Sequence, residues 1–182
     1  IRLNDFLLEQ GMKKMSLDEG VYVWRSGGIV RGMICLHVDD IMYCGDHSFK
    51  REIIGALKKT FSISAEAEQN FKYLGLQMKQ PSRGGIIVDQ SHYIKSLEEP
   101  EIDCAPRRKK DEKLNEEERK SLKGFVGQLA WAANLSHPEI CYDVRMASQD
   151  IESATIEDVL SVKKILRRLQ NNMNQNISFV AL

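Results

Sequence analysis

Two runs of apolar residues meet at a pair of adjacent aspartates, and this pattern constrains the fold more than any other part of the sequence. Residues 33–36 (MICL) precede the pair Asp39-Asp40, and residues 41–44 (IMYC) follow it. Adjacent carboxylates repel each other and are costly beside buried side chains, so the pair has to lie at the rim of the apolar layer. A β-hairpin that turns at Asp39-Asp40 places both side chains in water.

The flanking segments alternate between strand and helix patterns, which predicts a mixed fold. Residues with period-two alternation or short apolar runs predict strands, and residues at four-residue spacing (Phe49, Ile53, Leu57, Phe61) predict a helix. Strands are predicted over 21–25, 29–38, 71–80 and 85–90, and helices over 1–10 and 46–60. This order predicts an α+β fold with helices on one face of an antiparallel sheet.

The composition changes after residue 99. Residues 100–114 are charged, contain two prolines and lack periodicity, which indicates a boundary. The sequence that follows predicts helices, with capping residues Asn115 and Glu118 before the first and the cap spacing Thr155–Asp158 before the last. Their buried stripes are predicted to be Leu122, Phe125, Val126, Leu129 and Ala133, then Val159, Val162, Leu166 and Leu169.

The composition excludes several classes of protein. The 182 residues suit one sizeable domain or one and a half small ones, with an ordinary soluble composition. The 26 basic and 26 acidic side chains balance, so no net charge favours nucleic acid as a partner. No apolar run is long enough for a membrane span. The four cysteines and four histidines lack zinc spacing, so we expect free thiols in a reducing compartment.

The aspartate pair itself has two interpretations. Aspartate is a good turn residue, and the local pattern alone favours a simple turn. Alternatively, the two carboxylates stay together because they hold a divalent cation, since carboxylate oxygens are preferred ligands of Mg²⁺ in phosphoryl transfer. The spacing does not decide between these interpretations.

Longer motifs resemble one protein family. The stretch LHVDDIMYCG resembles the YxDD active-site hairpin of reverse transcriptases, in the surroundings typical of the Ty1/copia class of retrotransposons. The resemblance continues in order through KYLGLQM and HYIKSLEE to SLKGFVGQLAWAANLSHPEICYDVRMAS, which resembles the VGxLxYxAxxxRPDI segment of the helical thumb. It covers nearly all of the chain.

The resemblance implies roles for seven residues. Asp39 would be the principal catalytic metal ligand and Asp40 its neighbour of lesser role, with Mg²⁺ (or Mn²⁺) as the cofactor. Leu74 and Gly75 would lie in the primer grip, although Gly75 could also mark a simple β-bulge. Nucleic-acid contacts along the minor groove of the product duplex would come from one helix, through Lys123, Gly127 and Trp131. Burial habits alone would place Trp131 in a core.

The resemblance also implies an organisation and partners. Residues 1–99 would be part of a palm subdomain, 100–114 a linker, 115–176 a helical thumb, and 177–182 the start of a connection to a ribonuclease H module. The fold would be an antiparallel palm sheet with packed helices followed by an all-helical thumb. The intact enzyme would be an RNA-directed DNA polymerase that binds a primer–template RNA/DNA duplex and dNTPs. It would work within a Pol polyprotein, away from membranes, in cytoplasmic particles or the nucleus.

The sequence departs from the family pattern at two points. His37 stands where the hairpin motif usually has tyrosine. No aspartate precedes residue 32 in a strand context, since Asp5 lies in a predicted helix and Asp18 in a loop, and the basic fingers region is missing. We therefore expect the isolated chain not to polymerise. The alternative is a domesticated, catalytically inactive module kept for binding or structure.

Three clusters of charged residues bear on whether the chain contacts nucleic acid. The run of four basic residues at 107–110 is either a phosphate contact or a solvated linker. The basic residues at 163, 164, 167 and 168 are predicted to form a plain exposed helix face. The acidic residues at 98, 99, 101 and 103 would repel a phosphate backbone, so this loop is predicted to point away from a duplex.

Overall fold

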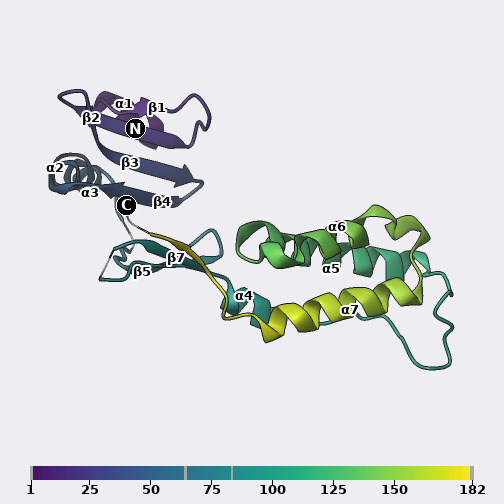
Figure 1. Ribbon diagram of the computed structural model, residues 1–182. Helices are drawn as coiled ribbons and strands as arrows, with labels where there is room; N and C mark the ends of the chain where they lie inside the picture. The colour runs from purple at the N-terminus through teal and green to yellow at the C-terminus, as the bar shows by residue number, and fades with distance from the viewer. Residues whose placement is uncertain (1, 64, 83, 181–182) are drawn as a thin grey trace. The chain divides into compact units, whose positions relative to one another are not determined.

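The computed structural model describes residues 2–63, 65–82 and 84–180 (Figure 1). The chain forms two compact units that meet in sequence between Ala67 and Glu68, here called the N-terminal unit and the C-terminal unit. Each unit combines helices with a four-stranded antiparallel sheet, which confirms the predicted α+β class. The strands form two sheets, one in each unit, where the sequence pattern suggested a single sheet.

The N-terminal unit contains one helix before its sheet and one helical segment after it. Its elements are α1 (Leu3–Glu9), β1 (Lys13–Lys14), β2 (Val21–Ser26), β3 (Ile29–His37), β4 (Asp40–Gly45), α2 (His47–Phe49), η1 (Lys50–Ile54) and α3 (Gly55–Thr60). The sheet order is β1-β2-β3-β4, so β4 is an edge strand. The predicted helix over 46–60 is confirmed, and its middle turn is a π-helix.

One face of this sheet packs against the helices. Gly32 and Gly45 lie opposite each other in β3 and β4, and a Cβ on either would lie within 2.3 Å of the Phe49 ring. The two glycines therefore make room for the fully buried aromatic ring of the following helix. Ile53 and Leu57 continue the buried stripe along that helix.

Along the sequence of the C-terminal unit, the helices come between the third and the fourth strand of the sheet. Its elements are β5 (Asn70–Tyr73), β6 (Leu76–Lys79), β7 (Ile86–Asp89), α4 (Ser91–Ser96), α5 (Glu116–Leu135), η2 (Pro138–Ile140), α6 (Cys141–Gln149), η3 (Ile151–Ser153), α7 (Ile156–Asn171) and β8 (Ile177–Phe179). The sheet order is β5-β6-β7-β8.

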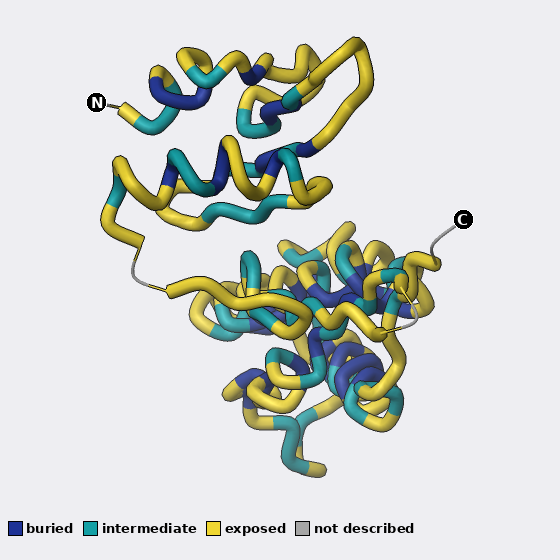
Figure 2. Tube along the Cα trace, turned by 90° about the vertical axis from the view of Figure 1, so that its left-hand side faces the viewer, coloured by how far each residue is buried: buried dark blue, intermediate teal, exposed yellow. Residues whose placement is uncertain are grey.

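The helices α5, α6 and α7 pack around one core (Figure 1). Buried positions gather in the interior of this unit (Figure 2). All residues of the predicted buried stripes are buried. The capping box at α5 is present: the Asn115 side chain accepts from the Glu118 N–H, and the Glu118 carboxylate accepts from the Asn115 N–H. At α7, the Asp158 carboxylate accepts hydrogen bonds from both the backbone N–H and the hydroxyl of Thr155.

One predicted strand is wrong in its extent. Residues 71–80 form a hairpin, because β5 and β6 pair with each other and Leu74-Gly75 is the turn between them. Both turn residues have positive φ, 49° for Leu74 and 78° for Gly75, as a two-residue type I′ hairpin requires. The next link, over 81–85, includes residue 83, which lies outside the described residues.

The compact units do not coincide with the predicted subdomains. Residues 100–114 belong to the C-terminal unit, in which Ile102 and Leu114 are buried in the helical core. β8 pairs with β7, so residues 177–179 complete the sheet of this unit, while 181–182 lie outside the described residues. The division into palm, linker, thumb and connection remains a prediction.

Candidate functional site

The aspartate pair lies at the free end of the β3–β4 hairpin. Asp40 begins β4 and pairs with His37, so the two turn residues are Val38 and Asp39. The predicted turn at Asp39-Asp40 is therefore one residue too late. The hydrogen-bond register decides this, because a two-residue turn leaves His37 and Asp40 as the first paired residues of the ladder.

The turn carries backbone strain. Val38 has a φ of 52°, a left-handed conformation that β-branched residues rarely adopt. The residue is also 85% exposed, so no local burial compensates for the strain. Strained residues of this kind cluster at functional sites, where the surrounding structure fixes them. Val38 was not among the residues predicted from the sequence, although a β-branched residue beside a turn aspartate was a usable signal.

Both carboxylates are exposed, and among the described residues the side chains of Asp39 and Asp40 have no hydrogen-bond or ion-pair partner. They supply hard oxygen ligands, and Mg²⁺ is commonly bound by one or two carboxylates together with substrate phosphates. The donor set therefore fits a magnesium ion that shares its ligands with a substrate. Within the described ranges, no group of three His, Cys, Asp or Glu side chains could hold a metal ion.

Two other acidic residues fix the elements that follow the hairpin. Asp46 accepts from the Ser48 hydroxyl (2.5 Å), the Phe49 N–H (3.0 Å) and Arg31 (3.1 Å), and these bonds lower its pKa to about 2. Glu66 accepts from Lys58 and from the Tyr43 hydroxyl, which together lower the pKa of Glu66. The Glu66 contact ties the segment after α3 to β4.

The predicted primer-grip residues form the tip of the β5–β6 hairpin. A Cβ placed on Gly75 would have no neighbour within 4 Å, so the turn is open to close approach by another molecule. The alternative of a bulge is wrong, since Leu74 and Gly75 are a regular turn. Asp39 and Gly75 lie in different units.

The predicted nucleic-acid residues share the exposed side of α5. Lys123 and Gly127 are exposed, and Trp131 is 45% exposed, so Trp131 is not the core residue that burial habits favour. A Cβ on Gly127 would meet nothing within 4 Å. Glycine in a helix interior costs about 0.5–1 kcal/mol relative to alanine, and the described residues offer no packing reason for it here.

Gly124 belongs to the same face and was missed by the sequence analysis. It is exposed, lies one turn before Gly127, and has open space at its Cβ position. Two glycines three residues apart within a predicted helix were the available signal. Together with Lys120, Lys123 and Trp131 they form a surface that we call the α5 face.

Most of the basic side chains at 107–110 form ion pairs with acidic side chains of the same chain. Arg108 donates to Glu118, to Glu112 (2.8 Å) and to the carbonyl oxygen of Asp103 (3.0 Å), and its side chain is only 15% exposed. Glu118 and Glu112 hold the pKa of Arg108 above its usual value. Arg107 pairs with Asp103 on the surface. Arg108 therefore has a structural role that neither interpretation of the run anticipated.

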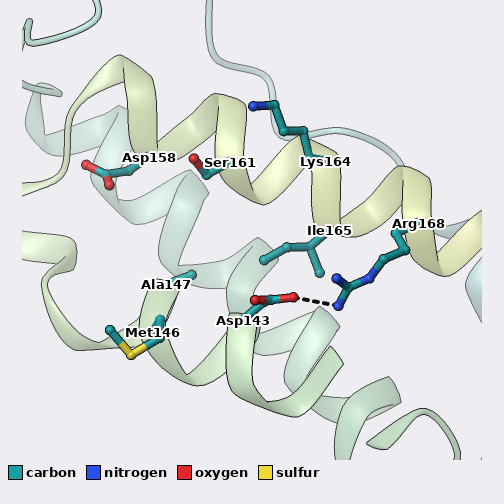
Figure 3. A pocket seen from close by; sticks show the side chains of 8 residues that line it. All are labelled: Asp143, Met146, Ala147, Asp158, Ser161, Lys164, Ile165 and Arg168. Carbon is teal, nitrogen blue, oxygen red and sulfur yellow. Dashed lines mark hydrogen bonds and ion pairs between the residues drawn. The ribbon is translucent and has the colours of Figure 1, made fainter. Parts of the chain in front are cut away.

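Three of the four basic residues on the predicted plain face of α7 form ion pairs. Lys163 and Arg167 both contact Glu99 at 3.0 Å, so the acidic loop is held against α7. Arg168 pairs with Asp143 at 2.5 Å at one side of a pocket of about 530 Å³ between α6 and α7 (Figure 3). The pocket wall mixes acidic, basic and apolar side chains, which gives it no single ligand chemistry.

The described helices include none that is both long and apolar enough to cross a bilayer. No protein-family model matches the chain. No solved structure matches it either.

Two curated proteins match the chain along nearly its whole length. It is 27% identical over 191 residues to the retrovirus-related Pol polyprotein from transposon RE1 of Arabidopsis thaliana, which covers 97% of this chain and 13% of that polyprotein. It is 25% identical over 189 residues to the transposon Ty5-1 protein of Saccharomyces cerevisiae, which covers 97% of this chain and 61% of that protein. The chain is thus related, over most of its length, to proteins of retrotransposons.

Proposed function

We propose that this chain is the part of a copia-type reverse transcriptase that carries one catalytic metal-binding hairpin and the helical thumb. The observation that carries the proposal is the adjacent, unpartnered carboxylate pair at the strained tip of an antiparallel hairpin. The similarity to a Pol polyprotein along 97% of the chain supports it.

In this proposal Asp39 is the principal ligand of Mg²⁺, and Asp40 is a secondary one. The bound ion would neutralise charge on the phosphates and lower the pKa of the attacking hydroxyl. The hairpin positions the carboxylates, because the β3–β4 ladder and the packed Phe49 hold its base rigid. Asp39 projects from the turn, where a primer terminus and a nucleotide can approach from solvent.

The α5 face is proposed to contact the minor groove of the primer–template duplex. Gly124 and Gly127 allow the helix backbone to come close to the sugar–phosphate surface. Lys120 and Lys123 supply positive charge for the phosphates, and Trp131 supplies an exposed aromatic surface. The Leu74-Gly75 turn is proposed as the primer grip.

Primer extension tests the polymerase proposal. The full native polypeptide that contains these residues is given an RNA template, a DNA primer, dNTPs and Mg²⁺. We expect extension that requires Mg²⁺ and is lost on Asp39→Asn, whereas the isolated chain of 182 residues should not extend a primer. Extension that survives Asp39→Asn would contradict the catalytic role of this hairpin.

A second candidate function is duplex binding without catalysis. It is favoured by one observation: the described residues place two carboxylates at the hairpin, and no third acidic or histidine ligand completes a metal-binding group. Under this alternative the native polypeptide binds an RNA/DNA duplex, Trp131→Ala weakens that binding, and no extension occurs at any Mg²⁺ concentration. The extension assay therefore separates the two functions.

A further inference from the structure

Sulfur-containing side chains gather on the face of the N-terminal sheet that is opposite the helices. Cys35 pairs with Met42, and Met33 pairs with Cys44, in two rungs of the β3–β4 ladder separated by one rung. Because side chains alternate along a strand, residues two apart project from the same face. The four side chains, which we call the sulfur quartet, therefore form a checkerboard of two thiols and two thioethers.

The sulfur quartet is accessible to solvent at its β4 edge, and apolar side chains of β2 flank it on the other side. Cys44 is exposed on the edge strand β4, and the other three members are half-buried. On the inner side, β2 places Val21 opposite Cys35 and Val23 opposite Met33. An ion can thus enter from solvent and meet a surface that offers sulfur ligands beside apolar side chains.

The positions of the two thiols do not suit a disulfide. Cys35 and Cys44 lie on neighbouring strands, two positions apart in the register, and burial together with the charges of Cys44 and Asp18 raises the pKa of Cys35. Diagonal positions on neighbouring strands lie about 7–8 Å apart, whereas a disulfide requires Cβ atoms about 3.5–4.5 Å apart. A metal ion between the sulfur atoms spans a longer gap than a direct S–S bond.

We propose that Cys35, Cys44, Met33 and Met42 form a binding site for a soft monovalent metal ion of the Cu(I) class. Thiolates and thioethers are the ligands that select Cu(I), whereas Mg²⁺ requires oxygen. Zn²⁺ is disfavoured, because thioethers are not among its usual ligands. Binding releases the thiol protons to solvent, so affinity falls as the pH is lowered.

A competition experiment tests the site. The reduced 182-residue chain is titrated anaerobically into the Cu(I) complex of bicinchoninate, and transfer of Cu(I) is followed by the loss of the chelator's colour. We expect one ion per chain. Cys35→Ser and Cys44→Ser should each lower the affinity by about 100-fold, and Met42→Leu by about tenfold.

The chain supplies its own matched control. Cys104 and Cys141 are also free thiols but lie in the C-terminal unit, so the Cys104→Ser/Cys141→Ser variant should bind Cu(I) as the wild type does. Absence of transfer to the wild type, or its loss in this control, overturns the proposal. Met42→Leu conserves side-chain volume and keeps the test decisive if a serine variant fails to fold; unchanged affinity in Met42→Leu overturns the thioether contribution.

Discussion

Asp39 and Asp40 are neighbours in sequence but occupy different places in the hairpin: Asp39 lies in the turn, and Asp40 is paired in the ladder with His37. The backbone of Asp40 is fixed by β3, and its side chain shares a sheet face with His37. Asp39 projects from the strained turn beside Val38. This difference in position fits unequal roles for the two carboxylates in metal binding.

Gly127→Ala is predicted to stabilise the isolated chain while weakening duplex binding. The Cβ enters open space. The variant should therefore gain about 0.5–1 kcal/mol in free energy of unfolding, because alanine lowers the conformational entropy of the unfolded chain. On the α5 face the same methyl group would hold the duplex away and raise the Kd on the order of tenfold. Urea unfolding and fluorescence anisotropy with a labelled RNA/DNA hybrid measure the two effects.

Gly55→Ala is the matched control for that experiment. Gly55 also lies within a helix, and its Cβ would make an ordinary contact of 3.8 Å with the Lys50 carbonyl oxygen. The variant should be stabilised similarly and bind the duplex like the wild type. If Gly127→Ala and Gly55→Ala bind equally well, the α5 face is not the contact surface.

Gly32→Ala is predicted to lower the free energy of unfolding of the N-terminal unit by about 1–3 kcal/mol or more, because the new Cβ would overlap the Phe49 ring. Trp24 fluorescence in a Trp131→Phe background reports the unfolding of this unit alone, since the chain has one tryptophan in each unit. Phe49→Ala in combination should remove most of the overlap. Additive free energies in this double-mutant cycle would show that the glycine and the ring do not interact.

Acid should weaken the N-terminal unit through Asp46. The folded-state pKa of about 2 lies below the ordinary value of 3.8, so the carboxylate stabilises the fold above about pH 4. That contribution is lost as the pH falls from about 4 to 2. Asp46→Asn keeps a good N-cap residue but does not titrate, so its unfolding midpoint should lack this fall. Parallel pH profiles for the two proteins would contradict the assignment.

Arg108→Ala and Arg107→Ala are predicted to differ in stability although each removes one positive charge. Arg108 joins the 100–114 segment to Glu118 at the start of α5, so its loss should lower the thermal midpoint measured by far-UV circular dichroism. Arg107 is exposed, so Arg107→Ala should leave the thermal midpoint nearly unchanged, because surface ion pairs contribute little to stability. An equal loss of duplex affinity in both variants would instead indicate phosphate contacts by the basic run.

Periodicity was sufficient to predict the longer helices, whereas the short helix α4 (Ser91–Ser96) was not predicted. The stripe that includes Leu122 and Leu129, the Asn115 capping box and the helix containing Phe49 and Leu57 are all present as predicted. These features depend on local chemistry and on which side of a helix is apolar, and both can be read from neighbouring residues.

Turn register and long-range pairing were not predictable in the same way. The hairpin at Leu74-Gly75 was interpreted as one strand, because its apolar residues run through the turn and leucine rarely adopts a positive φ. The contacts of Glu99 with Lys163 and Arg167 of α7 join segments distant in sequence, which no local pattern encodes. The exposed glycines of α5 became informative only when the space around each Cβ was known.

The most direct measurement is primer extension by the full native polypeptide with Asp39→Asn, Asp40→Asn and Asp18→Asn compared at several Mg²⁺ concentrations. We expect Asp39→Asn to reduce extension on the order of 10²–10³-fold or more, Asp40→Asn to reduce it less, and Asp18→Asn to leave it unchanged. Extension by Asp39→Asn at the wild-type rate would contradict a catalytic role for this hairpin.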